Sequence, residues 1–164
     1  MQTLNPYLHE RFTNRDDILA HLAKSVLSFE TPLSLFSGFI LEKDAHQNQI
    51  DLKKGGIFAI VHGIRTLALE NNITKTNTIL CIKELNNRGL FDKTFATELI
   101  EAYDTLLGIR LKAMLSHPDD FENANFIDPS KLEKLERDLL KDSFKVVNTL
   151  KKFLTYHFHL NMVL

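Results

Sequence analysis

The feature that most constrains this chain is a strand-like run that meets two adjacent glycines and continues as an apolar helical pattern. Residues 50–53 read Ile-Asp-Leu-Lys, so Asp51 and Lys53 are expected on one face of a strand. Gly55 and Gly56 permit backbone conformations that a Cβ disfavours, which predicts a tight turn. The helix expected after them would present free backbone N–H groups and the positive end of its dipole. The stretch therefore suits a phosphate or carboxylate, although an ordinary glycine turn beside solvated lysines has the same pattern.

The charge balance limits the classes of partner. The chain has 164 residues, enough for one domain with a substantial core, and we expect a single domain over residues 1–164. It carries 20 Lys and Arg residues and 21 Asp and Glu residues, which leaves a formal charge of −1. Such a chain has no global basic field, so we expect neither nucleic acid nor an anionic membrane surface as a partner. A local cationic pocket is compatible with the same totals.

A single cysteine and the lack of a long apolar run indicate the compartment. Cys81 is the only cysteine, which excludes an internal disulfide and favours a reducing environment. It lies among Ile79, Leu80 and Ile82 in an expected helix, so a small core residue is favoured over a nucleophile. The sequence has no N-terminal signal pattern and no apolar run near the roughly 20 residues that span a bilayer. We expect a cytoplasmic protein.

Helical periodicity dominates the rest of the chain. Apolar residues recur at helical spacing, and residues suited to capping, such as Asp92, precede several of these segments. Helices are expected over about residues 14–29, 57–70, 77–88, 93–117 and 129–161. A candidate strand at 35–41 would turn back onto 50–53. The expected fold class is therefore mainly α, a helical bundle with long C-terminal helices and one small β-hairpin near residues 35–53.

The residues of a self-sufficient catalytic site are missing. Metal-dependent nucleotidyl transfer uses two acidic side chains on one strand face, and the nearest candidate, Asp51-Leu52-Lys53, has lysine in the second position. The sequence also lacks a P-loop, a Gly-x-Ser-x-Gly elbow, paired cysteines and a His-Glu-x-x-His motif. His157 and His159 point in divergent directions on a predicted helix and are expected to be surface or packing residues. We expect no catalytic residue, no metal site and no autonomous activity in this chain.

Three arginines border apolar helical stripes. Arg65, Arg110 and Arg137 each lie at helical spacing from apolar residues. An arginine near a core face needs an anion or other acceptors, because an unpaired buried charge is costly. One interpretation is structural, such as an intrahelical pair between Glu133 and Arg137. The other is that these arginines and Lys53 line one cleft that binds a phosphate or an acidic group.

Six short motifs follow one another along nearly the whole chain. They read Pro32-Leu33-x-x-Phe36-x-Gly38-Phe39, Ile50-Asp51-Leu52-Lys53-x-x-Gly56-Ile57, Ile60-Val61-x-x-x-Arg65-x-x-Ala68-Leu69, Leu107-x-x-Arg110-Leu111, Asn125-x-Ile127-Asp128-Pro129 and Leu135-Glu136-Arg137-x-x-Leu140-Lys141-x-x-Phe144-Lys145-Val146-Val147. Each motif alone is weak. Together, and in this order, they resemble the nucleotidyltransferase substrate-binding domain family, which is found at the C-terminal end of bacterial signalling proteins.

In that family the domain usually follows a nucleotidyltransferase domain similar to the uridylyltransferase that modifies nitrogen-regulatory proteins. Cyclic-nucleotide-binding or cystathionine-synthase-type regulatory domains often stand further upstream. The resemblance implies that this chain is a substrate-binding or accessory domain of a signal-transduction protein, and that it presents a target to a separate catalytic domain. It also implies that Mg²⁺ and a nucleoside triphosphate bind to that partner domain, so that this chain holds no cofactor and the parent protein is the nucleotidyltransferase.

The residues expected to bind the substrate combine both lines of reasoning. Basic side chains would neutralise phosphate, the glycines would open backbone donors, and an asparagine would supply a directional amide. The expected set is Lys53, Gly55, Gly56, Arg65, Arg110, Asn125 and Arg137. The alternative is a regulatory protein–protein interaction or dimerisation module without nucleotide contact, because the last helix ends in apolar residues on more than one face. These are Phe153, Leu154, Tyr156 and Phe158.

Overall fold

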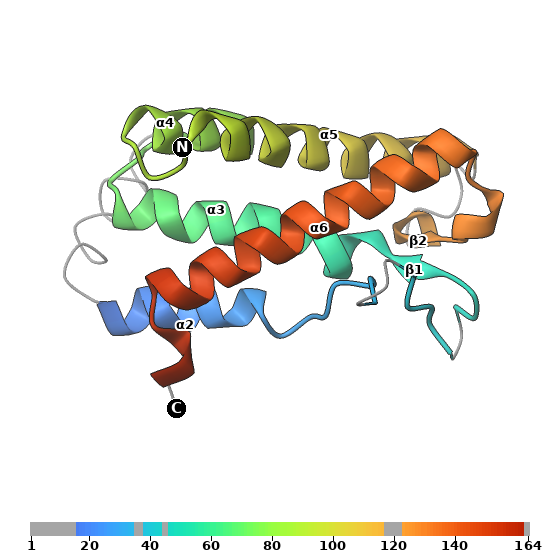
Figure 1. Cartoon of the computed structure of the whole chain (residues 1–164), viewed down its shortest axis with the longest axis horizontal. Coiled ribbons are helices and arrows are strands. Elements are labelled where there is room, and N and C mark those ends of the chain that lie inside the picture. The colour runs from blue at the N-terminus through green and yellow to red at the C-terminus, as the bar shows by residue number, and fades with distance from the viewer. Residues whose placement is uncertain (1–15, 35–37, 44–45, 117–122, 163–164) are drawn as a thin grey trace.

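Amphipathic segments of the sequence fold into helices that each bury one face, and a computed structural model shows how they assemble (Figure 1). The structure describes residues 16–34, 38–43, 46–116 and 123–162. Its helices are α2 (Asp16–Val26), α3 (Phe58–Glu70), α4 (Thr78–Asn87), α5 (Lys93–Ser116) and α6 (Lys134–His157). The shorter elements are β1 (Ile50–Asp51), the π-helical turn η1 (Lys53–Ile57), β2 (Phe126–Ile127) and the 3-10 turns η2 (Asn123–Asn125), η3 (Pro129–Lys131) and η4 (Leu160–Met162).

The helices form a bundle in which α6 is the element that contacts most of the others. Figure 1 shows α4 and α5 along one edge, α2 along the opposite edge, and α6 crossing diagonally over α3 between them. The sheet lies at one end of the bundle, near the start of α6. One stripe of α6 is buried in the core because its members recur every three or four residues. These residues are Leu140, Phe144, Val147, Leu150 and Leu154.

Local cap signals act as the sequence predicts. The side chain of Asn77 accepts a hydrogen bond from the Leu80 N–H at 3.1 Å, and α4 begins directly after it. Asp92 accepts one from the Phe95 N–H at 2.8 Å at the start of α5. Gly89, with a φ of 78°, follows the end of α4 in the left-handed conformation that glycine adopts readily. The mainly helical class with one small two-stranded sheet is thus confirmed.

The partner of the strand at residues 50–51 differs from the predicted one. β1 pairs antiparallel with β2, with Ile50 opposite Ile127, and not with residues 38–41, the described part of the candidate strand. The polar turn does close, because the Glu42 N–H donates to the Gln49 carbonyl at 2.8 Å. The backbone of residues 38–40, however, forms its hydrogen bonds with residues 32–34. Residues 35–37 of the candidate strand, and the predicted first-helix start at 14, lie outside the described residues.

The glycine pair is part of a helix, so the predicted tight turn at this position is wrong. Gly55 and Gly56 lie in η1, which runs without a break into α3, and both are buried. A Cβ on Gly55 would lie 2.4 Å from Cδ of Pro32. A Cβ on Gly56 would lie 2.8 Å from Cδ1 of Leu106 and 3.1 Å from Cε1 of Phe144. Glycine is required here by close packing rather than by an unusual backbone angle.

The last helix starts later than predicted. Asp128 accepts a hydrogen bond from the Ser130 N–H at 2.9 Å and Pro129 follows it, but this cap opens the short turn η3. The chain then becomes extended at Leu132 and Glu133, with ψ angles of 146° and 156°. α6 begins at Lys134 behind a capping box formed by Glu133 and Glu136. An early cap followed by proline thus marks a turn that precedes the helix.

Candidate functional site

A pocket of about 540 Å³ opens where the C-terminal half of α5 meets the small sheet. Three segments that are distant in the sequence build it: residues 46–49, the end of α5, and residues 123–132. We call it the sheet-end pocket. Its lining consists of His46, Gln49, Ile109, Lys112, Ala113, Ser116, Asn123, Ala124, Phe126, Ile127, Asp128, Lys131 and Leu132.

The sheet-end pocket combines an apolar floor with a polar rim. Ile109 and Ile127 are buried in the core cluster, and Ala113 and Leu132 pack against that cluster. Lysines, a carboxylate and amides lie among the remaining lining residues. Ligand sites commonly have this composition, since apolar walls supply binding energy and a few polar groups fix the orientation. The pocket is therefore the candidate ligand site of the described part of the chain.

A stacked pair of rings forms one wall of the pocket. The rings of His46 and Phe126 lie 3.4 Å apart between centroids and are inclined by 4°. His46 Nδ1 also lies 3.1 Å from Oε1 of Gln49, within hydrogen-bonding distance. The stack holds the turn before β1 against β2, so these two pocket walls are connected by side chains as well as by the sheet. No motif in the sequence marks His46 or Phe126 as site residues.

The structure brings two of the predicted site residues together beside this pocket. The Nε–H of Arg110 donates to Oδ1 of Asn125 at 2.7 Å. Asn125 follows Ala124 and precedes Phe126, both of which line the pocket. Within the described residues, the terminal nitrogens of the half-buried Arg110 make no hydrogen bond or ion pair. Those nitrogens retain donors suited to an oxyanion.

The charged groups at the pocket rim are partly neutralised by the protein itself. Nζ of Lys112 lies 2.6 Å from Oε1 of Glu136, which ties α5 to the first turn of α6. The hydrogen bond between them raises the pKa of Lys112 and lowers the pKa of Glu136. Hydrogen bonds from the Ser130 side chain and backbone lower the pKa of Asp128. Lys131 remains as an exposed cation on the rim, so a ligand with an apolar body and one anionic group would suit this lining.

Arg65 is placed at the other end of the bundle. Its Nη1 and Nη2 donate to the backbone carbonyls of Lys75 and Thr76 at 3.2 and 2.7 Å. These carbonyls lie in the connection between α3 and α4, far from the sheet in Figure 1. Arg65 and Arg110 therefore do not share a cleft, and Arg65 holds a loop.

The start of the helical segment after β1 carries its own carboxylate. Oδ1 of Asp51 accepts the Lys54 N–H at 2.9 Å, and Nζ of Lys54 lies 3.8 Å from Oδ2 of the same carboxylate. An acidic side chain at this position complements the positive end of the helix dipole. Lys53 is exposed in η1, and the glycines beside it are buried. Arg137 is half-buried in the first turns of α6.

Residues for which the sequence predicts packing roles have them. Cys81 is 1% exposed, burial raises the pKa of its thiol, and the thiol donates to the Lys75 carbonyl at 3.2 Å. His157 Nε2 lies 2.7 Å from Oε2 of Glu70 on α3 and its ring stacks on Phe153. The described residues contain no cluster of three or more His, Cys, Asp or Glu side chains that could hold a metal ion. They also contain no helix long and apolar enough to cross a membrane.

Comparison with known proteins identifies the class. The model of the family described as "putative nucleotidyltransferase substrate binding domain" matches residues 16–158, which is most of the chain. The chain belongs to this family. No curated protein and no solved structure matches it.

Proposed function

We propose that this chain is the substrate-binding, accessory domain of a nucleotidyltransferase-type signal-transduction protein in the bacterial cytoplasm. It presents a target to a separate catalytic domain, upstream or in trans, and that domain binds Mg²⁺ and the nucleoside triphosphate. Membership of the family supports association with a nucleotidyltransferase. The proposal gives this chain the task of recognition and leaves the chemistry to its partner.

The sheet-end pocket is the observation that carries the proposal. Its apolar floor and polar rim suit a small molecule or a protruding side chain that has an anionic end. Arg110 lies beside the pocket, where its hydrogen bond to Asn125 holds it, and its guanidinium supplies donors for that anion. Lys131 supplies a second cation at the rim. The remaining predicted residues are not among those that line the pocket; they are Lys53, Gly55, Gly56, Arg65 and Arg137.

A panel of small carboxylates and phosphomonoesters, with ATP and UTP tested with and without Mg²⁺, tests the proposal. Amide chemical shifts of the labelled chain report where each compound binds. We expect saturable shifts for a member of the anion panel at residues of the sheet-end pocket. Ala113→Trp, which places a large ring in the pocket, should abolish these shifts, whereas Thr97→Trp, at an exposed position of the same helix, should preserve them.

Two results would count against the proposal. Binding of a triphosphate in the pocket would make it a nucleotide site rather than a target site. Absence of shifts at the pocket with every compound would remove it as a small-ligand site. The second outcome would favour a regulatory protein–protein interaction or dimerisation module.

One observation favours that second candidate function. Four large apolar side chains are exposed on the adjoining ends of α5 and α6, which the ion pair between Lys112 and Glu136 connects. They are Leu111, Leu115, Leu135 and Leu139, with exposures of 55%, 74%, 69% and 46%. In contrast, Leu154 and Phe158 from the end of the last helix are buried in the core. The apolar surface available to a partner thus includes the α5–α6 end. Light scattering across a concentration series tests dimerisation directly.

A further inference from the structure

We propose that one edge of α6 is a docking surface for an acidic helix of a protein partner. The surface consists of five basic residues on the same edge, and we call it the α6 basic stripe. Its members are Lys134, Arg137, Lys141, Lys145 and Lys152. The inference is separate from the ligand proposed for the sheet-end pocket, because none of these residues lines that pocket.

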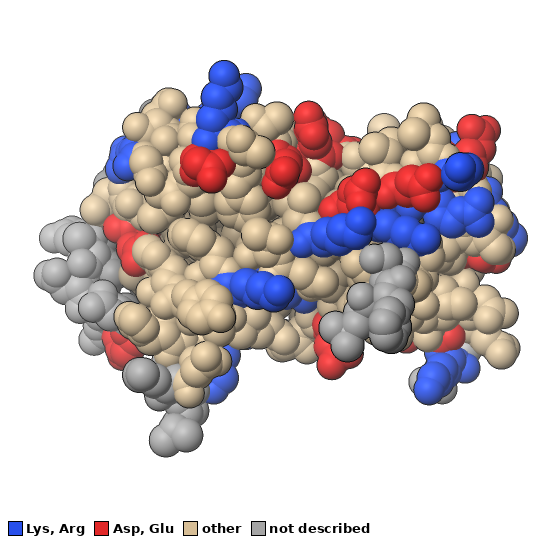
Figure 2. Space-filling model, in the orientation of Figure 1, with Lys and Arg blue, Asp and Glu red and all other residues tan. Residues whose placement is uncertain are grey.

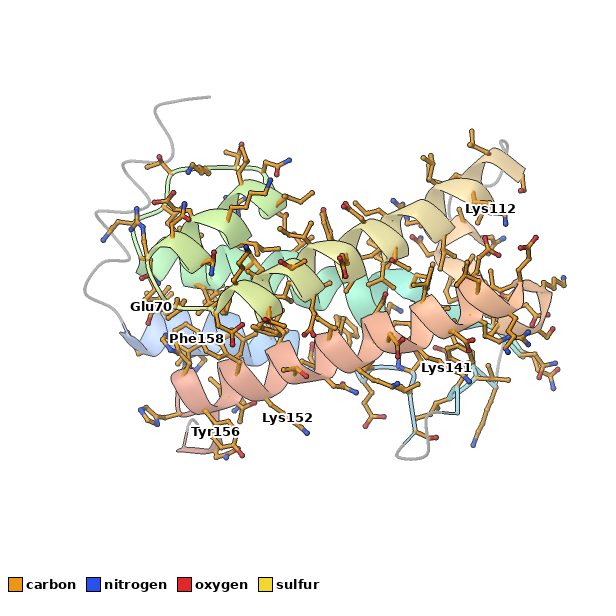
Figure 3. All side chains as sticks on the ribbon, turned by 45° about the horizontal axis from the view of Figure 1, so that its top comes forward. Glu70, Lys112, Lys141, Lys152, Tyr156 and Phe158 are labelled. Carbon is orange, nitrogen blue, oxygen red and sulfur yellow. The ribbon has the colours of Figure 1, made fainter. Side chains whose placement is uncertain are left out.

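The spacing of the α6 basic stripe follows the helical period. Its members are three, four, four and seven residues apart, so they remain near one line along the helix. With a rise of about 1.5 Å per residue, the stripe extends over about 27 Å. Figure 2 shows Lys and Arg side chains as a band over α6, and Figure 3 shows Lys141 and Lys152 on the same edge of that helix. In Figure 2 the band runs over the first half of α6, and a further basic patch lies apart from it toward the end of the helix.

Most of the stripe has no carboxylate partner in the described part of the chain. Lys134, Arg137, Lys141 and Lys152 form no ion pair there, whereas Nζ of Lys145 lies 2.7 Å from Oδ1 of Asp142. Like charges four residues apart on a helix, as at 137, 141 and 145, destabilise it. An acidic partner would relieve the repulsion among these three cations.

Part of the stripe is already ordered for binding. Nζ of Lys141 lies 5.5 Å from the centroid of the Phe39 ring, a cation–π contact that restrains the lysine chain. Lys141 and Arg137 are both half-buried, whereas Lys134 and Lys152 are exposed. Side chains that are restrained before binding lose less conformational entropy when a partner arrives.

An acidic row beside the stripe indicates a protein rather than a nucleic acid. Asp138 and Asp142 are exposed next to the basic residues, and Figure 2 shows acidic side chains directly above the basic band. Glu98 and Glu101 on α5 line the groove that Asp142 also lines. A continuous polyanion would be repelled by this row, and the whole chain has a formal charge of −1. A protein helix can place carboxylates on the basic stripe and cations on the acidic row.

The geometry also indicates the form of the partner. Carboxylates four residues apart on a helix repeat about every 6 Å along its axis. The cations at 137, 141 and 145 have the same repeat, so a helix that lies along α6 can pair with Arg137 and Lys141 and can reach Lys145 by exchange with its exposed partner Asp142. Electrostatic pairing of this kind sets register and orientation more than raw affinity.

A designed helical peptide serves as the probe. It carries Glu every four residues on one edge and Lys on the neighbouring edge, and a control peptide of the same composition has the order scrambled. Fluorescence anisotropy of the labelled peptides is measured with the full chain at low and at physiological salt. We expect the designed peptide to bind more tightly than the scrambled one and to weaken as salt is added.

Charge reversal locates the binding surface. Arg137→Glu/Lys141→Glu should weaken binding by about tenfold or more, as expected for charge reversal in an interface. Lys83→Glu/Lys93→Glu, at exposed positions of α4 and α5, should leave binding unchanged. The neutral pair Arg137→Gln/Lys141→Gln, checked for native circular dichroism, separates loss of the surface from loss of the fold.

Several outcomes would overturn the proposal. Equal binding of the two peptides would show that only net charge matters. An equal loss with the Lys83 and Lys93 control would place the interaction elsewhere. Stronger competition by a single-stranded oligothymidylate would identify a polyanion site instead, and absence of peptide binding at low salt would remove the docking surface altogether.

Discussion

The Nε–H of Arg110 donates to Oδ1 of Asn125 at 2.7 Å, and this contact fastens the C-terminal half of α5 to the segment that leads into β2. A hydrogen bond from a charged donor contributes more than a neutral one. The link joins two walls of the sheet-end pocket that the sheet itself does not connect.

Removing both partners should cost less than the sum of the single changes. We expect Arg110→Ala and Asn125→Ala each to lower the free energy of unfolding, with a coupling energy of about 1–2 kcal/mol in the double variant. Urea denaturation of the four proteins in the cycle measures this value. Strictly additive effects would mean that the hydrogen bond contributes nothing to the fold.

Two glycines should respond in opposite directions to the same substitution. Gly55→Ala would place its Cβ 2.4 Å from Cδ of Pro32, whose ring cannot rotate away, so the backbone must move. We expect a loss of about 2 kcal/mol or more in the free energy of unfolding, as for other overpacked sites.

Gly108→Ala is the matched control. A Cβ at Gly108 meets no atom within 4 Å, and the residue is exposed within α5. Alanine favours the helix by about 0.5–1 kcal/mol over glycine, so this variant should be more stable than the native chain. Urea midpoints that fall for both variants would contradict the steric explanation.

Arg65 should act on the stability of one loop. Arg65→Ala removes the donors to the carbonyls of Lys75 and Thr76, and we expect it to lower the free energy of unfolding by about 1–3 kcal/mol. Amide exchange measured by NMR should become faster in the α3–α4 connection than in α6. Unchanged stability together with lost ligand binding would instead support the substrate role that the sequence predicts.

Lys151 should make the stability depend on pH in the alkaline range. Its ammonium donates to the Phe29 carbonyl at 2.6 Å and to Oγ1 of Thr31 at 2.9 Å. Burial lowers the pKa of Lys151 from 10.5 to about 8, and the charge of Glu30 opposes that shift. Between these two pKa values the unfolded chain binds more protons, so the contribution of Lys151 to the free energy of unfolding rises with pH.

The difference in free energy of unfolding between the native chain and the Lys151→Met variant measures this effect. Urea denaturation is performed below the folded pKa of about 8 and again near the unfolded pKa of 10.5. The stability of the native chain relative to the variant should increase at the higher pH. The matched control, Lys152→Met, replaces the exposed neighbour. A native-to-variant difference that is constant or falls with pH would contradict the prediction.

The helices could be predicted from the sequence because their signals are local. Asn77 and Asp92 cap the helices that they precede, and apolar spacing gives the buried stripe of α6. The partner of β1 could not be predicted, because a two-residue strand has no periodicity and its partner lies beyond three intervening helices. The sequence predicts a turn at Gly55, because it does not distinguish a glycine needed for its backbone angles from one needed for close packing against Pro32.

The site could be predicted only in part, because contacts between residues that are distant in the sequence leave no local signal. The sequence predicts both Arg110 and Asn125 as site residues. Their contact, however, depends on how the segment that follows α5 packs back against that helix. His46 and Phe126 became neighbours through the long-range pairing of the sheet. Arg65 carried the same signal as Arg110, an arginine beside an apolar stripe, and the fold uses it to hold a loop.

The sheet joins Ile50 to Ile127, and α3, α4 and α5 all lie in the chain between those two positions. Closing so large a loop costs conformational entropy that two residues of strand pairing cannot offset alone. We therefore expect the sheet to form after the intervening helices have packed, and to open earlier in native-state fluctuations than the helical contacts do. The sheet-end pocket is lined from both sides of this pairing, so a ligand bound there would hold the two strands together and stabilise this end of the domain.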